Sequence, residues 1–274
     1  SVAANKRKGK RIVTTAIEHE SVLESVGELE KQGFEVIRLE PDETGNITEK
    51  QIYEAVNGDT ILVTVMYVNN EVGSILPINA VKKAVKRANA PALIHIDCVQ
   101  AYGKLPIKPS KIGADLVTVT AHKIHGPKGV GALYIKKGTR IVPRTYGGEQ
   151  ERKIRPGTES SALIAGFGEA VRQIPDYAES RKYIGELNAY ARQELEKIEG
   201  VKINNPTSSS DYIISVYVPT FMTSQTVLQH LSAQYGVYVS NGSACAKGKK
   251  SHVLSAMKLS DNVIESTVRV SFGR

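Results

Sequence analysis

The 274-residue sequence contains only two cysteines, Cys98 and Cys245. They can form one disulfide bond at most, so a disulfide framework is excluded. At about this length a domain buries roughly 75% of the surface that its unfolded chain exposes, so a hydrophobic core suffices without disulfides or a structural metal. Scarce cysteines are typical of proteins in a reducing compartment, and we expect a cytoplasmic protein without metal ligands.

The sequence also lacks a hydrophobic run that fits a membrane span. The uncharged stretch from Tyr212 to Gln229 is interrupted by Pro219 and is rich in Ser, Thr and Gln, which hydrocarbon does not accept. The basic segment from Asn5 to Arg11 precedes an apolar run that is too short for the core of a secretory signal. We therefore expect neither a membrane anchor nor an export signal.

Positive charge is in moderate excess, with 36 Lys and Arg against 28 Asp and Glu and a formal net charge of +8. An excess of positive charge can favour the binding of an anionic partner such as nucleic acid. Much of the excess lies in residues 6–11 and 247–250, and a solvated face or tail is the commoner explanation of such runs. We do not expect nucleic-acid binding.

In the first half of the chain, apolar runs alternate with helical patterns. This alternation predicts an α/β fold in which helices cover a mostly parallel sheet on both faces. The run from Thr60 to Met66 is apolar without alternation, as in a strand buried on both faces. The predicted strands are Arg11–Ala16, Phe34–Leu39, Thr60–Met66, Ala92–Ile96 and Asp115–Thr120.

A different pattern follows in the second half. Helices are expected over Ser161–Gln173 and Ala178–Glu199, and short strands then surround a helix over Thr223–Gln234. We expect two domains: residues 1–175 form a large α/β domain, and residues 176–274 form a smaller α+β domain.

Polar residues follow four of the predicted strands at the points where they end. In open α/β sheets, ligands bind outside the carboxyl ends of the strands, so these residues are the first candidates for a site. The candidates are His19, Asn69–Glu71, Asp97 with Gln100, and Thr120–Lys123. Each alone is as well explained by helix capping or surface exposure, but their joint placement favours a site.

A lysine, an aspartate and a histidine at such a sheet edge are the groups that a pyridoxal phosphate site requires. The lysine forms a Schiff base with the cofactor aldehyde, the aspartate keeps the pyridine nitrogen protonated, and a ring stacks on the cofactor. Lys123 is followed by a glycine-rich turn, where backbone can approach a ligand closely. A Walker-type phosphate loop is excluded, because the sequence has no Gly-Lys-Ser or Gly-Lys-Thr ending.

Five motifs in this order resemble those of the pyridoxal-phosphate-dependent cysteine desulfurases of the NifS/IscS type, in the class-V aminotransferase family. The resemblance covers essentially the whole chain and implies the type I fold of these transferases, whose large domain has a seven-stranded type of sheet. The motifs are Glu18-His19-Glu20-Ser21-Val22-Leu23, Val68-Asn69-Asn70-Glu71-Val72-Gly73, His95-Ile96-Asp97-Cys98-Val99-Gln100, residues 121–129 around Lys123, and Gly242-Ser243-Ala244-Cys245.

The resemblance implies a role for each matching residue. Lys123 binds pyridoxal 5'-phosphate, Asp97 pairs with the pyridine nitrogen, and His19 stacks on the ring. Gln100 and Asn70 contact the phenolic oxygen, with Asn70 also near the substrate. The phosphate is bound by Thr120, His122 and, across a homodimer interface, Thr158. Arg269 binds the carboxylate of the substrate, for which a bidentate guanidinium is suited.

Cys245 carries the sulfur chemistry in this interpretation. Its thiolate attacks the sulfur of L-cysteine, which leaves L-alanine and an enzyme persulfide for iron–sulfur cluster assembly or tRNA thiolation. The surrounding small residues and lysines favour a thiolate on a loop that moves between the cofactor and a sulfur-acceptor protein. The alternative role for Cys245 is a buried structural thiol, which is the role we expect for Cys98.

Members of the family also carry an N-terminal phosphate-binding turn and a closing C-terminal helix that this sequence does not contain, so we expect a fragment of a desulfurase. Its activity is left open. One alternative is a catalytically silent piece that acts only by binding a partner. Others are a selenocysteine lyase or an aminotransferase on the same fold.

Overall fold

The computed structural model describes residues 2–241 and 250–273. Its larger part is a six-stranded sheet in the order β2-β1-β3-β4-β5-β6. The first five of these strands by sequence run parallel, and β6 runs antiparallel to β5. The strands are β1 (Arg11–Thr15), β2 (Glu35–Leu39), β3 (Thr60–Met66), β4 (Leu93–Asp97), β5 (Leu116–Thr120) and β6 (Gly131–Ile135).

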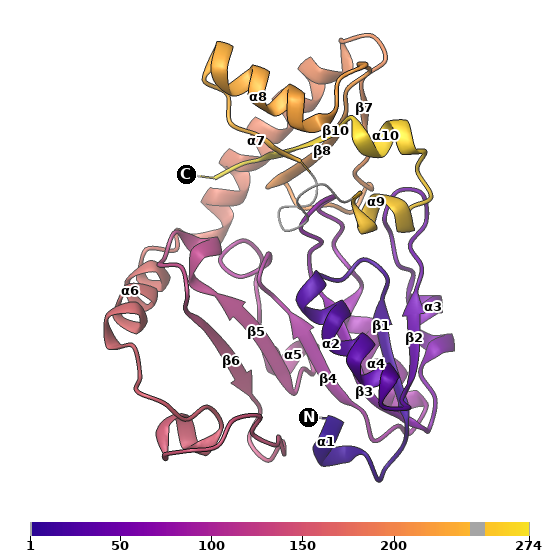
Figure 1. Cartoon of the computed structure of the whole chain (residues 1–274), viewed down its shortest axis with the longest axis vertical. Helices are drawn as coiled ribbons and strands as arrows, with labels where there is room; N and C mark the ends of the chain where they lie inside the picture. Colours follow the sequence, from indigo (N-terminus) through magenta and orange to yellow (C-terminus); the bar gives the residue numbers. More distant parts are fainter. Residues whose placement is uncertain (1, 242–249, 274) are drawn as a thin grey trace.

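Helices cover both faces of this sheet (Figure 1). On one face Val26 of α2 (Glu20–Lys31) packs with Ile12 and Ile61 of the strands. On the other, α3 (Glu49–Ala55) and α4 (Ile78–Arg87) contribute to the largest core cluster. Every residue of β3 is buried, as its unbroken apolar sequence predicts. The shorter elements nearby are α1 (Val2–Asn5), α5 (Pro109–Ile112) and two 3-10 turns, η1 (Ala121–Ile124) and η2 (Gln150–Lys153).

A second, four-stranded antiparallel sheet has the order β7-β8-β10-β9. It lies at the top of the view in Figure 1, facing the carboxyl ends of the parallel strands, and α7 (Tyr177–Glu196) leads to it from α6 (Ser161–Arg172). Its elements are β7 (Lys202–Ile203), β8 (Ile213–Tyr217), α8 (Ser224–Tyr235), β9 (Ser240–Asn241), α9 (His252–Ala256), α10 (Asp261–Glu265) and β10 (Thr267–Ser271).

The two sheets are joined by polar and apolar contacts. The Asn205 side chain donates hydrogen bonds to the carbonyls of Val72 and Ile213, both at 2.8 Å. Val253 and Leu254 of α9 are buried in the core cluster of the six-stranded part. The segment before β10 therefore packs on the large sheet although its neighbours in sequence belong to the small one.

The α/β architecture confirms the fold predicted from the apolar runs. Within the described residues the large sheet has six strands, whereas the resemblance implied a seven-stranded type. Strand β6 and helix α3 were not predicted; α3 begins at a capping box formed by Thr48 and Gln51. Cys98 is fully buried in the core, as expected. The pKa of its thiol is raised to about 12, mainly by burial and to a smaller extent by the nearby Asp97.

Candidate active site

Several of the predicted site residues lie at the carboxyl ends of the parallel strands. Asp97 is the last residue of β4, and Thr120 is the last residue of β5. Lys123 follows within η1, and His19 precedes α2 as its N-cap. Because parallel strands end at the same edge, these side chains are brought to one end of the sheet, where the four-stranded sheet faces them (Figure 1).

Asp97 and His19 form the first part of the site. The Asp97 carboxylate accepts a hydrogen bond from the Val99 amide at 2.9 Å. Burial raises the pKa of Asp97, while that hydrogen bond and the nearby His19 oppose the rise. Nδ1 of His19 accepts a hydrogen bond from the Ser21 amide at 3.2 Å, and this bond caps α2 and orients the imidazole ring. A buried carboxylate thus lies within electrostatic reach of an oriented imidazole.

Asn70 and Arg269 form the second part. One guanidinium arm of Arg269, on β10, donates to the backbone carbonyl of Asn70 at 2.7 Å. The side-chain oxygen Oδ1 of Asn70 is buried and has no hydrogen-bond partner within residues 2–241 and 250–273. A buried polar atom of this kind has a desolvation cost that a bound polar group would relieve. The loop after β3 therefore carries a buried acceptor on the residue whose backbone contacts Arg269.

The third part surrounds Lys123. Thr120 Oγ1 donates to the Val130 carbonyl at 3.2 Å and lies 3.0 Å from Nδ1 of His122. Desolvation, Lys123 and Lys128 lower the pKa of His122. Lys123 lines a cavity of about 330 Å³ together with Lys104, Tyr212 and Phe272, so it faces residues of the small sheet as well as its own turn.

Lys104 was not among the predicted site residues. Its ammonium lies 3.5 Å from Oε1 of Gln100 and 5.2 Å from the centre of the Tyr212 ring. Burial, followed by the charges of Lys123 and Arg269, lowers the pKa of Lys104 to about 8. Its position four residues after Gln100, on the same side of a helical turn, was the available sequence signal.

Two buried glutamates near the site were also not assigned roles. Glu18 is fully buried and accepts hydrogen bonds from Thr15 Oγ1 and the Met66 amide. Burial raises the pKa of Glu18 to about 8. Glu71 accepts a hydrogen bond from the Ser251 hydroxyl at 2.5 Å. Burial raises the pKa of Glu71, while the Ser251 hydrogen bond and the nearby His252 and Arg269 oppose the rise.

Two predicted residues are not placed with the others. Thr158 is exposed and lies after η2, where it lines a different cavity with Tyr146 and Arg155. Its expected role at a partner subunit's phosphate stays a prediction. Cys245 lies outside the described residues. Among the described residues no group of three or more His, Cys, Asp or Glu is arranged to hold a metal ion, and no helix there has the length and apolar character of a membrane span.

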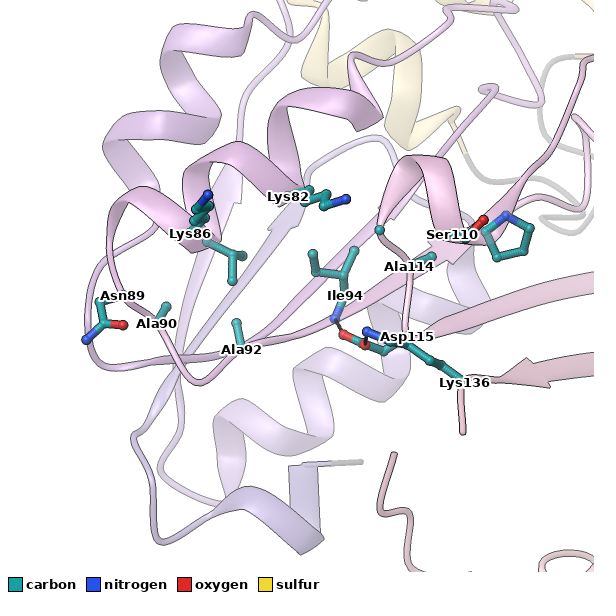
Figure 2. Close-up of a pocket in the computed structure, with 13 residues that line it drawn as sticks. Lys82, Lys86, Asn89, Ala90, Ala92, Ile94, Ser110, Ala114, Asp115 and Lys136 are labelled. Carbon is teal, nitrogen blue, oxygen red and sulfur yellow. Dashed lines mark hydrogen bonds and ion pairs between the residues drawn. The ribbon is translucent and has the colours of Figure 1, made fainter. Parts of the chain in front are cut away.

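A further cavity, of about 410 Å³, opens at the other end of the large sheet. Figure 2 shows Asp115 at its floor, bonded to the Ile94 amide and to Lys136, with Lys82 and Lys86 of α4 nearby. None of the predicted site residues lines this cavity. This cavity therefore lies apart from the candidate site at the carboxyl ends of the strands.

Comparisons with known proteins identify the family of the chain. Residues 1–274 match the family described as Aminotransferase class-V. The chain belongs to this family. It is 39% identical over 270 residues to the cysteine desulfurase IscS of Dictyoglomus turgidum, covering 97% of this chain and 68% of that relative. It is 38% identical over 275 residues to the IscS of Methanosarcina thermophila, covering 99% of this chain and 67% of that relative.

Solved structures in the same family have the same fold. A NifS-like protein superimposes with a TM-score of 0.90 at 35% identity, covering 99% of this chain and 72% of the other. DndA from Streptomyces lividans gives a TM-score of 0.82 at 31% identity, covering 98% and 77%. The resemblance seen in the five motifs is thereby confirmed: the class-V chain is of the NifS/IscS cysteine desulfurase type. Enzymes of this type depend in general on pyridoxal phosphate.

The residues at the site fit that cofactor. Asp97 offers a buried carboxylate suited to a protonated ring nitrogen, and Oδ1 of Asn70, which has no hydrogen-bond partner among the described residues, offers a buried polar atom to a ligand. Lys123 provides an amine that lines the neighbouring cavity, which Asp97 and Asn70 do not line. These groups are chemically compatible with pyridoxal phosphate.

Proposed function

We propose that this protein is a pyridoxal-phosphate-dependent cysteine desulfurase, which converts L-cysteine to L-alanine and leaves the sulfur as a persulfide on Cys245. The observation that carries the proposal is the hydrogen bond from Arg269 to the Asn70 carbonyl. It places the predicted carboxylate-binding arginine, from the end of the chain, directly on a predicted cofactor-binding loop.

Each residue has a role toward the cofactor. Lys123 would bind its aldehyde carbon, Asp97 would pair with the ring nitrogen, and His19 would lie on the ring face. Asn70 and Gln100 would contact the phenolic oxygen. The phosphate would be bound by Thr120 and His122, with Thr158 serving the second site of a homodimer. When bound, the cofactor supplies an electron sink that activates the substrate's bonds.

The chain's own groups then bind and transform the substrate. The Arg269 guanidinium binds the substrate carboxylate, held in place by its bond to the Asn70 carbonyl. Lys123 moves the proton of the substrate α-carbon through Nζ. The thiolate of Cys245 attacks the substrate sulfur: a sulfur–sulfur bond forms, the carbon–sulfur bond breaks, and the former Cβ takes a proton to become the methyl group of alanine.

The proposed organisation follows from this reaction. Residues 1–175 form the cofactor-binding domain, and residues 176–274 form the domain that supplies Cys245 and Arg269. A persulfide is a carrier, so a sulfur-acceptor protein, such as an iron–sulfur scaffold or a tRNA-thiolation enzyme, takes the sulfur in the cytoplasm. A similar solved structure is that of SspA in complex with cysteine, a protein 29% identical with a TM-score of 0.83, and it supports cysteine as the substrate.

The experiment is an assay of alanine and sulfide after incubation with cysteine, pyridoxal phosphate and a reductant. Cys245→Ala is expected to abolish both products, because no thiolate receives the sulfur. Cys98→Ala, the same change at the buried cysteine, serves as the control and retains turnover. Equal turnover in Cys245→Ala and the unaltered protein would overturn the assignment of the nucleophile, and alanine formed only from selenocysteine would overturn the substrate.

A further inference from the structure

Lys104 lies between the predicted cofactor site and the small sheet. It ends the helical turn that begins after β4, in which the Tyr102 amide bonds to the Cys98 carbonyl and the Lys104 amide to the Ala101 carbonyl. This turn places Lys104 Nζ 3.5 Å from Gln100 Oε1. On its other side the ammonium faces the ring of Tyr212, which precedes β8.

The charged neighbours of Lys104 are cations. Lys123 of η1 and Arg269 of β10 both lower its pKa, in addition to the effect of burial. No carboxylate of residues 2–241 or 250–273 forms an ion pair with Lys104. Clustering like charges in a partly buried place has an electrostatic cost. A lysine kept there without an anion indicates that an anionic group completes the cluster.

An ammonium has donors only, so its contact with the Gln100 side chain must be made to the carbonyl oxygen of that amide. The NH₂ group of Gln100 is then directed away from Lys104 and can serve only as a donor. The proposed partner of Gln100 is the phenolic oxygen of the cofactor, which accepts such a bond best when it is ionised. The turn therefore leaves the NH₂ group of Gln100 oriented to donate a hydrogen bond to an anionic oxygen.

We propose that Lys104 is a positioning residue for cofactor binding: it fixes the Gln100 amide with its NH₂ toward the phenolic oxygen, and its charge favours the ionised form of that oxygen. The inference rests on the proposed function, since it concerns the same cofactor. Gln100 is the group that touches the cofactor, and Lys104 acts through it and through its charge.

The charge predicts the direction of a spectroscopic effect. Lys123 and Arg269 are the charged groups that act on Lys104, and His19 acts on Asp97. The other titratable groups that line the cavity of Lys104 and Lys123 are His125, Tyr183 and Tyr212. Positive charge opposes protonation of any group beside it, so removal of the Lys104 charge strengthens proton binding by the bound cofactor. The midpoint of the cofactor's pH-dependent visible absorbance then moves to higher pH.

The test is a pH titration of the visible absorbance of the cofactor-loaded full chain. In Lys104→Met, which keeps most of the stem, the midpoint rises by roughly one pH unit, the lower range for loss of one nearby charge. Lys104→Arg keeps charge and donors and leaves the midpoint within a few tenths of that of the unaltered protein. Lys83→Met, at an exposed position on α4, is the matched control and leaves it unchanged.

Lys104→Gln is the second neutral variant, for the case that Lys104→Met does not fold, and is expected to give the same upward shift. If a neutral variant shows the visible band with an unchanged midpoint, the proposed role of Lys104 is overturned, whereas the proposed function is not. If the unaltered protein forms no visible band with pyridoxal phosphate, the proposed function fails, and this inference fails with it. The two failures are therefore distinguished in one titration series.

Discussion

The Ser251 hydroxyl donates a hydrogen bond to the buried carboxylate of Glu71, 180 residues earlier in the chain. The same hydroxyl accepts from the Leu254 amide and so caps α9. The next residue, His252, donates from Nε2 to the Glu18 carbonyl at 2.8 Å. These bonds attach the chain that follows the predicted cysteine segment to two loops of the candidate site, those that carry His19 and Asn70.

Removing the Ser251 hydroxyl should therefore destabilise the protein. Ser251→Ala loses the cap of α9 and leaves Glu71 buried without that donor, which together are expected to cost about 2–4 kcal/mol in the free energy of unfolding. Urea unfolding followed by circular dichroism measures the loss. Ser255→Ala removes an exposed hydroxyl from the same helix and should cost much less; equal losses in both variants would show that the Glu71 contact contributes nothing.

Glu18 predicts a pH dependence of stability. Burial raises the pKa of its carboxyl to about 8 in the folded protein, whereas in the unfolded chain it ionises near its usual pKa of about 4.3. The folded state therefore holds a proton that the unfolded state releases, and stability from this group declines as pH rises from about 5 to 8. In Glu18→Gln this decline is removed, because an amide does not ionise.

The measurement is urea unfolding of both proteins at a series of pH values. Glu43→Gln, at an exposed position, is the control and should keep the pH dependence of the unaltered protein. A Glu18→Gln profile parallel to that of the unaltered protein across this range would mean that the Glu18 carboxyl is already ionised in the fold.

From the contact of Arg269 we predict that lysine cannot replace arginine at this position in binding cysteine. One guanidinium arm is bonded to the Asn70 carbonyl, and this bond fixes the plane of the guanidinium group. Arg269→Lys keeps the charge but cannot make both sets of bonds. We expect KM for cysteine to rise about tenfold or more, the equivalent of one charge-assisted hydrogen bond, with a smaller change in kcat.

Steady-state alanine formation at varied cysteine concentration measures this split. Arg144→Lys, an exposed position, is the matched control. An unchanged KM in Arg269→Lys would exclude a carboxylate-binding role for Arg269.

The sequence predicts those parts of the fold that depend on local patterns. The strand over Thr60–Met66 was predicted with its bounds, because a strand buried on both faces needs an unbroken apolar run. Strand β6 was missed although residues 132–135 are apolar, because this short run directly follows a glycine-rich turn; in the structure its residues are mostly exposed. The strand-end rule likewise located His19, Asp97 and Lys123 at one edge of the sheet.

The remaining features depend on tertiary contacts that no local pattern encodes. The bond between Glu71 and Ser251 joins residues far apart in sequence, and only the packing of α9 on the large sheet brings them together. The buried cation cluster around Lys104 arises in the same way, because Arg269 arrives from the small sheet. The roles assigned to the individual site residues stay predictions until variants are measured.

The central claim, that Lys123 is the cofactor-binding lysine, is tested most directly by reduction of the pyridoxal-phosphate-loaded protein with borohydride, followed by peptide mass spectrometry. The account predicts one pyridoxyl-phosphate mass increment, on the peptide that contains Lys123, and its loss in Lys123→Ala but not in Lys128→Ala. An increment found on other lysines while the Lys123 peptide is unmodified would contradict it.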